Sequence, residues 1–267
     1  MLRHYPPSLT KGEQAKEHNA SDYYLVVCTC YCLSCVLVSS ASNTTNFEWV
    51  WALAGWLSLG LMLRGEPLLV RLQVLVAIIF ATVGEFYASV HMGGYIYHQG
   101  GVPAYVPAGH GMVYLSAIAL GRSALFQNHA RAVTVLVVML GSCWSLWGLY
   151  DPALQLDVTG ALLFCIFMVC LLFGRNPMVY LGAFFVTSFL EIVGTSTGVW
   201  YWVVIDPATG LPQGNPPSGV AAYYCMVDAV AIGAAPYLMR WVESLQGHTA
   251  GFKEKKDRAT EERKRRT

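Results

Sequence analysis

Eight stretches of predominantly apolar residues constrain the fold of this chain more than any other feature. A helix needs about 20 mostly apolar residues to cross the hydrocarbon core of a bilayer, which is about 30 Å thick. The stretches span residues 23–41, 47–63, 67–92, 104–121, 131–150, 157–174, 177–202 and 217–240. Only 12% of the residues are charged, against about 25% in soluble domains. The sequence therefore predicts an all-α polytopic membrane protein with about eight transmembrane helices.

Positive charge is confined to the connections on one side of the predicted membrane and to the two ends of the chain. Six arginines lie in or beside these connections or at the end of the last stretch: Arg64, Arg71, Arg122, Arg131, Arg175 and Arg240. The remaining loops contain acidic residues but no Lys or Arg. Because Lys-rich and Arg-rich loops stay in the cytoplasm, we expect a multi-pass plasma-membrane protein. Its residues 1–22 and its charged tail, 241–267, would both be cytoplasmic.

Two parts of the chain repeat one pattern. Glu85 is followed ten residues later by Tyr95, and Glu191 is followed ten residues later by Tyr201. Each segment then enters a loop rich in Gly and Pro and a further apolar stretch. Because four spans are an even number, two such units would share one orientation and be related by an axis along the membrane normal. The pattern predicts a tandem duplication of a four-helix unit, with repeats at residues 23–121 and 131–240.

Three acidic residues lie well inside the apolar stretches, away from the ends of these stretches near which Glu48 and Asp157 lie, and ionisable groups at such depth are costly and usually functional. They are Glu85, Glu191 and Asp228. A helical rise of about 1.5 Å per residue puts Glu191 and Asp228 at similar depths on consecutive helices, with no Lys or Arg at that depth. We therefore expect these two carboxyls to lie within hydrogen-bonding reach, directly or through one water, and to share a proton, which would equip them for acid/base catalysis. A packing seam with hydrogen-bonded acids is the alternative interpretation.

Histidines gather in the connection between the third and fourth stretches. If Pro107 begins the fourth helix, His110 lies in its first turn, within reach of Glu85. We expect a hydrogen-bonded pair of Glu85 and His110 that is either structural or relays protons. A metal shell of His91, His98, His110 and Glu85 is the alternative, although the spacing matches no compact metal-binding motif.

Aromatic residues are frequent around the two predicted outer loops. Interfacial Trp and Tyr commonly form belts at the level of the lipid headgroups. Here, however, they recur at matching positions of the two repeats, beside Gly-Pro turns, so they can also line a mouth for an elongated apolar molecule. The residues that we assign to substrate binding are Tyr95, Tyr97, Trp200, Tyr201, Asn215 and Thr195.

Both repeats carry a Glu, then a Gly-rich turn, then Tyr-x-Tyr or Trp-Tyr-Trp, and then Val-Pro or Asn-Pro-Pro. Over about residues 83–111 and 190–219, this pattern resembles a family of bacterial polytopic membrane proteins assigned to carotenoid biosynthesis. Some members of that family hydrate carotenoid double bonds. The resemblance implies an isoprenoid or lipid substrate.

Together these features favour a membrane enzyme that acts on a hydrophobic substrate, lipid or isoprenoid-like, near the outer leaflet. Glu191, Asp228, Glu85 and His110 would carry its acid/base chemistry. The alternatives are a proton- or cation-coupled transporter that uses the same acids and a non-catalytic subunit of a membrane complex. The sequence contains no phosphate-binding glycine loop and no CxxCH motif, so it identifies no cofactor. We expect membrane lipids and the substrate as partners, no nucleic acid, and leave homo- or hetero-oligomers open.

Overall fold

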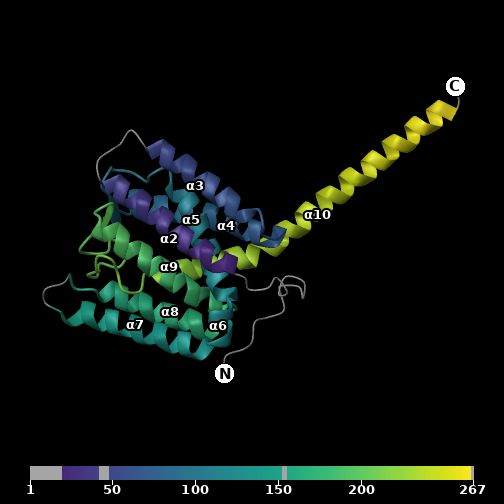
Figure 1. The fold of residues 1–267 in the computed structure, drawn as a ribbon. Helices are drawn as coiled ribbons and strands as arrows, with labels where there is room; N and C mark the ends of the chain where they lie inside the picture. Colours follow the sequence, from purple (N-terminus) through teal and green to yellow (C-terminus); the bar gives the residue numbers. More distant parts are fainter. Residues whose placement is uncertain (1–19, 42–47, 152–154, 266–267) are drawn as a thin grey trace.

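The computed structural model describes residues 20–41, 48–151 and 155–265, and it is mostly helical (Figure 1). Within these residues, five helices are long and apolar enough to cross a membrane: Asp22–Ala41, Leu68–His91, Ala130–Tyr150, Pro177–Ser196 and Ala221–Leu245. Glu48–Leu63 and Val158–Phe173 are shorter apolar helices. The chain is therefore a multi-pass, all-α type of membrane protein, and the count of eight spans stays a prediction.

Each predicted apolar stretch overlaps a helix. The elements are α2 (Ala20–Ala41), α3 (Glu48–Leu63), α4 (Leu68–Glu85), the π-helix η2 (Phe86–His91), β1 (Tyr95–Tyr97), α5 (Val106–Arg122), α6 (Ala124–Asn128), α7 (Ala130–Tyr150), α8 (Val158–Phe173), α9 (Pro177–Ser196), β2 (Trp200–Trp202) and α10 (Ala221–Arg265). Most of the predicted N-terminal segment, 1–22, lies outside the described residues. The predicted tail from residue 241 continues α10, which extends well beyond the other helices in Figure 1.

The seventh stretch departs from the all-α prediction at its end, and a short strand also follows the third stretch. The seventh was expected to stay helical to residue 202, but α9 ends at Ser196 and residues 200–202 form β2. Gly198 lies between them with φ +73, a left-handed conformation that ends helices and that glycine adopts without strain. Gly93, with φ +69, separates η2 from β1 in the same way. The two strands pair antiparallel, and we call the pair the aromatic ribbon.

Four helices form the centre of the bundle. Helix α5 packs along α9 and α4 packs along α10, while α4 also contacts α5 and α9 contacts α10. The helices α2 and α3 cover one side of this core, and α7 and α8 cover the other (Figure 1). Fully buried alanines on the central helices, such as Ala117, Ala183 and Ala231, allow the close approach on which helix packing in lipid depends.

Glycines bring the backbones of α5 and α9 into direct contact. A Cβ atom on Gly121 would lie 2.9 Å from the carbonyl oxygen of Met178, and one on Gly182 would lie 2.5 Å from that of Ala117. Each glycine therefore faces the backbone of the opposite helix, which cannot move aside as a flexible side chain can.

An ion cluster fixes the end of α5 that lies away from the ribbon. The Arg122 guanidinium lies 2.6 Å from an Asp22 carboxylate oxygen and 2.7 Å from a Glu66 carboxylate oxygen. Asp22 belongs to α2, and Glu66 precedes α4. One arginine thus joins three segments, and its planar fork suits two carboxylates at once.

The contact between α5 and α9 predicts a position-specific glycine effect. Gly182→Ala should lower the free energy of unfolding by about 1–3 kcal/mol, because overpacking against backbone forces the helices apart. Gly233→Ala is the matched control, since a Cβ atom there meets nothing within 4 Å, and alanine favours helix by about 0.5–1 kcal/mol. Thermal unfolding in detergent measures both, and equal stability of the two variants would contradict the close contact.

Candidate functional site

Glu85 is the C-terminal residue of α4, and its carboxylate is surrounded by polar side chains of the ribbon and α5. The hydroxyls of Tyr95 and Tyr97 donate to the same oxygen, Oε1, at 2.5 and 2.6 Å. The other oxygen, Oε2, lies 3.3 Å from Nε2 of His110 in the first turns of α5. The predicted contact between Glu85 and His110 is therefore present, but Nε2 of His110 makes no hydrogen bond within the described residues.

The two tyrosines act only as hydrogen-bond donors. Burial, followed by the neighbouring Glu85 carboxylate, raises the pKa of both Tyr95 and Tyr97 far above the ordinary tyrosine value. Both hydroxyls therefore keep their protons and remain available to the carboxylate at any pH that the protein meets.

Glu191 of α9 has a matching environment built from tryptophans. The indole N–H groups of Trp200 and Trp202 both donate to its Oε2 atom at 3.0 Å. A Cβ atom on Gly194 would collide with the Trp200 ring. Because Gly194 has no side chain, the Trp200 ring fits against α9 and its N–H group can reach the Glu191 carboxylate.

The register of the ribbon explains why these four rings point inward. Successive residues of a strand face opposite sides, and Tyr95 pairs with Trp202 while Tyr97 pairs with Trp200. The four rings are buried, and the ring centroids of Tyr95 and Trp202 lie 4.6 Å apart. Tyr201, which we had matched to Tyr95, instead lies on the outward side and is 48% exposed.

A second polar chain leads from His110 to α10. The Nδ1 atom of His110 lies 2.9 Å from the Tyr224 hydroxyl, so His110 connects Glu85 with Tyr224. Neither Trp202 nor Tyr224 was among the predicted site residues. The sequence could have indicated Trp202, because Trp200 and Trp202 alternate in the same way as Tyr95 and Tyr97. No feature of the sequence pointed to Tyr224.

The site brings the two glutamates together. Glu191 interacts electrostatically with Glu85, and Tyr224 lies within electrostatic range of the Glu85, Glu191 and Asp228 carboxyls. Among the described residues, no Lys or Arg forms an ion pair with any of the three acids. The two paired strands of the ribbon thus place Glu85 and Glu191 at one site, each bound to one strand.

A direct hydrogen bond between Glu191 and Asp228, one form of the expected pair, is absent from the described residues. Both carboxyl oxygens of Asp228 are buried and have no hydrogen-bond partner in the described part of the chain, while the Glu191 carboxylate is turned toward the ribbon. Depth along the helices suggested the pair, but the tryptophan donors decide where the Glu191 side chain points.

The alternative of a metal shell is also corrected. Over the residues described, no group of three or more His, Cys, Asp or Glu side chains is arranged to hold a metal ion. His91 is exposed and stacks on Tyr87 with ring centroids 5.4 Å apart, and His98 is exposed next to the ribbon. Of the four residues in the predicted shell, only His110 and Glu85 form a pair.

Two further predicted substrate-binding residues have structural contacts. The Asn215 side chain accepts a hydrogen bond from the backbone N–H of Trp202 at 2.9 Å, so it holds β2. The Thr195 hydroxyl donates to the backbone carbonyl of Glu191 at 2.7 Å. Asp157 holds the same loop, because its carboxylate accepts from the backbone N–H groups of Gly214 and Ser218.

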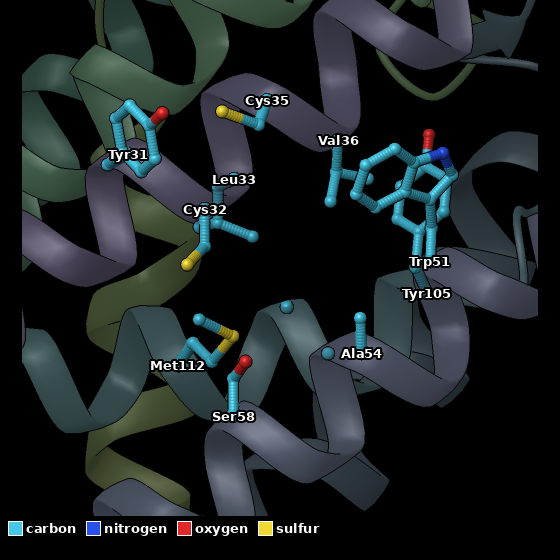
Figure 2. Close-up of a pocket in the computed structure, with 12 residues that line it drawn as sticks. Tyr31, Cys32, Leu33, Cys35, Val36, Trp51, Ala54, Ser58, Tyr105 and Met112 are labelled. Carbon is cyan, nitrogen blue, oxygen red and sulfur yellow. The ribbon is translucent and has the colours of Figure 1, made fainter.

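A separate cavity of about 310 Å³ opens between α2, α3 and α5. Figure 2 shows its lining, which includes Trp51, Ala54, Ser58, Tyr105 and Met112. None of the three acids lines it. Gly109 and Met112 belong to the same helix as His110, so this apolar cavity and the carboxylate site share α5.

The inward tyrosines that donate to Glu85 should stabilise the protein more than Tyr201, whose ring faces outward. Tyr97→Phe should lower the free energy of unfolding by about 1.5–3 kcal/mol, the usual effect of losing a hydrogen bond to a charged group. Tyr201→Phe, at an outward position of the partner strand, should change it by less than about 0.5 kcal/mol. Unfolding in detergent would test this, and a Tyr97 variant as stable as the control would contradict the bond to Glu85.

Comparison with known proteins gives no match. No protein-family model matches the chain, and neither curated proteins nor solved structures give a significant match. The functional interpretation below therefore rests on the residues of this chain alone.

Proposed function

We propose that this protein is a membrane enzyme that acts on a hydrophobic, lipid or isoprenoid-like substrate by acid/base chemistry. The observation that carries the proposal is the pair of interacting carboxyls, Glu85 and Glu191, each held by two aromatic donors of one ribbon. Two carboxyls that interact without a neighbouring cation favour a state in which they hold one proton between them. A carboxylic acid beside a carboxylate is the equipment for general acid and general base catalysis.

The proton has a defined route in this mechanism. The protonated member of the pair donates to the substrate, and the ionised member accepts a proton from it. His110 lies 3.3 Å from Glu85 through Nε2 and 2.9 Å from the Tyr224 hydroxyl through Nδ1, so Tyr224 helps to hold the imidazole beside the Glu85 carboxyl. Such a site suits hydration, isomerisation or group transfer, all of which need a proton at one atom and its removal from another.

The surroundings of the site favour an apolar substrate. The buried rings of the ribbon and the Tyr223 ring, which stacks on Trp202 at 6.3 Å between centroids, form hydrophobic walls beside the carboxyls. The cavity between α2, α3 and α5 is apolar as well, and its volume lies at the lower end of small-molecule sites, about 300–1,000 Å³.

The topology that we propose has eight spans, with both termini in the cytoplasm and the ribbon near the outer face of the plasma membrane. The six arginines outside the terminal segments support it, because the ribbon loops contain none. The duplication into residues 23–121 and 131–240 is supported by the shared element order. In each half a helix that carries the Glu is followed by a strand with two inward aromatic residues and by a central helix.

A proton-coupled transporter is the second candidate. The observation that favours it is Asp228, a third acid with no exposed surface and no hydrogen-bond partner within the described residues. An isolated carboxyl inside a bundle is typical of proton pathways in transporters.

Removing either proton-carrying group should abolish the reaction. Glu85→Gln and Glu191→Gln should each lower turnover by about 10²–10⁴-fold, the usual contribution of a general acid or base. Mass spectrometry of lipid extracts from cells with and without the gene would first identify the product. Glu48→Gln is the control, because Glu48 binds a backbone N–H away from the site and should leave the product unchanged.

The outcomes of that experiment separate the two candidates. A new lipid mass that disappears in both site variants supports the enzyme. A compound that changes only its distribution across the membrane, with no new mass, supports the transporter. Full activity of both variants would remove the pair from the mechanism.

The topology can be tested with single cysteines in a cysteine-free background. Cysteines at Gln99 and Thr209, both next to the ribbon, should react with a membrane-impermeant thiol reagent from outside intact cells. A cysteine at Asn128, exposed in α6, should react only after the membrane is opened. Labelling of positions 99 and 209 from opposite sides would overturn the eight-span arrangement.

A further inference from the structure

A group of buried polar atoms lies deeper in the bundle than the carboxylate pair. We define the inner polar layer as Thr82 of α4, Ser116 of α5, Thr187 and Ser188 of α9, and Asp228 of α10. Their side-chain oxygens are buried and have no hydrogen-bond partner among the described residues. All four central helices contribute to the layer.

The position of the layer follows from helix geometry. Thr82 precedes Glu85 by three residues and Thr187 precedes Glu191 by four, which is about 4.5–6 Å along the helix axis. On the oppositely directed helix α10, Asp228 follows Tyr224 by four residues, about 6 Å. The layer therefore lies about one turn further into the membrane, and Asp228 shares a helix face with Tyr224.

The hydroxyls of this layer differ from other helical hydroxyls in the chain. A Ser or Thr in a helix ordinarily donates to the carbonyl four residues earlier. Ser34, Ser89, Thr134, Thr195 and Thr197 all do so, at 2.7–2.9 Å. Thr82, Ser116, Thr187 and Ser188 leave this local bond unmade, so their buried hydroxyls remain available to a partner inside the bundle.

Asp228 gives the strongest reason to expect that partner. Its side chain has no exposed surface, and burying a carboxyl without a hydrogen bond or a counter-charge is among the costliest events in a protein interior. Tyr180 and Tyr224 lie within its electrostatic range. Buried polar groups that find no protein partner generally bind internal water, which needs two to four polar contacts. The layer offers at least that number.

We propose that the inner polar layer encloses a small water-binding chamber, in which Asp228 is neutralised by a proton and hydrogen-bonds to water. The carboxyl keeps its proton because its ionised form would be a buried charge with no cation paired to it among the described residues. The chamber does not depend on the proposed enzyme activity.

Infrared difference spectroscopy of the full chain in lipid bilayers tests the chamber without any substrate. The spectrum of the wild type minus that of Asp228→Asn should contain the carbonyl band of one protonated carboxylic acid at neutral pH. In D₂O this band should shift to lower frequency within minutes, because water reaches the group. A difference spectrum without an acid band, or with a band that D₂O leaves unshifted, would overturn the proposal.

A second pair of variants keeps the test decisive if Asp228→Asn does not fold. Thr187→Val removes one hydroxyl of the layer at nearly constant shape, whereas Thr195→Val removes a hydroxyl that is bonded to its own helix. We expect the D₂O shift of the acid band to become several-fold slower in Thr187→Val and to stay at the wild-type rate in Thr195→Val. Equal rates in the two variants would mean that Thr187 contacts no water and would overturn the chamber.

Discussion

Two carboxylates at one end of an apolar bundle need hydrogen-bond donors, and the architecture around them follows from that need. No Lys or Arg forms an ion pair with either within the described residues, so neutral donors must replace a counter-charge. Aromatic O–H and N–H groups can do this while their rings stay in an apolar setting. The helices α4 and α9 therefore give way near their carboxylates to short strands, whose alternation turns two donors per strand toward one acid.

The central bundle determines which groups meet at this site. Because α5 packs along α9 and α4 along α10, each acid lies beside a helix from the other half of the chain. His110 of α5 and Tyr224 of α10 consequently meet beside Glu85. The backbone contacts at Gly121 and Gly182 leave α5 little freedom to slide, so the fold holds the distance from His110 to Glu85.

Length and hydrophobicity predict the helices of this chain well, because an apolar run in lipid has to satisfy its own backbone hydrogen bonds. The same reasoning could not find the ribbon, since strands of three residues give too short an alternation to compete with a helical run. It also could not foresee that Glu191 binds the ribbon and makes no direct hydrogen bond to Asp228 in the described part of the chain. The depth of a residue along a membrane helix can be counted from the sequence. The direction of the Glu191 side chain cannot, because it depends on the position of Trp202, and that position depends on where α9 ends. Tyr224 could not be predicted for the same reason. Its neighbour Tyr223 is the same residue type, and only the packing of α10 decides which of the two contacts His110.

The hydrogen bonds distinguish acids that hold the structure from acids suited to chemistry. Asp157 uses both oxygens for backbone N–H groups, with Oδ1 accepting from Gly160 and Gly214 and Oδ2 from Ser218. The donors to Glu85 instead converge on Oε1, and those to Glu191 converge on Oε2. Two donors on one oxygen fix the orientation of each carboxyl, and the second oxygen takes no part in these hydrogen bonds. In Glu85 that oxygen lies 3.3 Å from His110 Nε2, so the imidazole is the nearest basic group to the free side of this carboxyl.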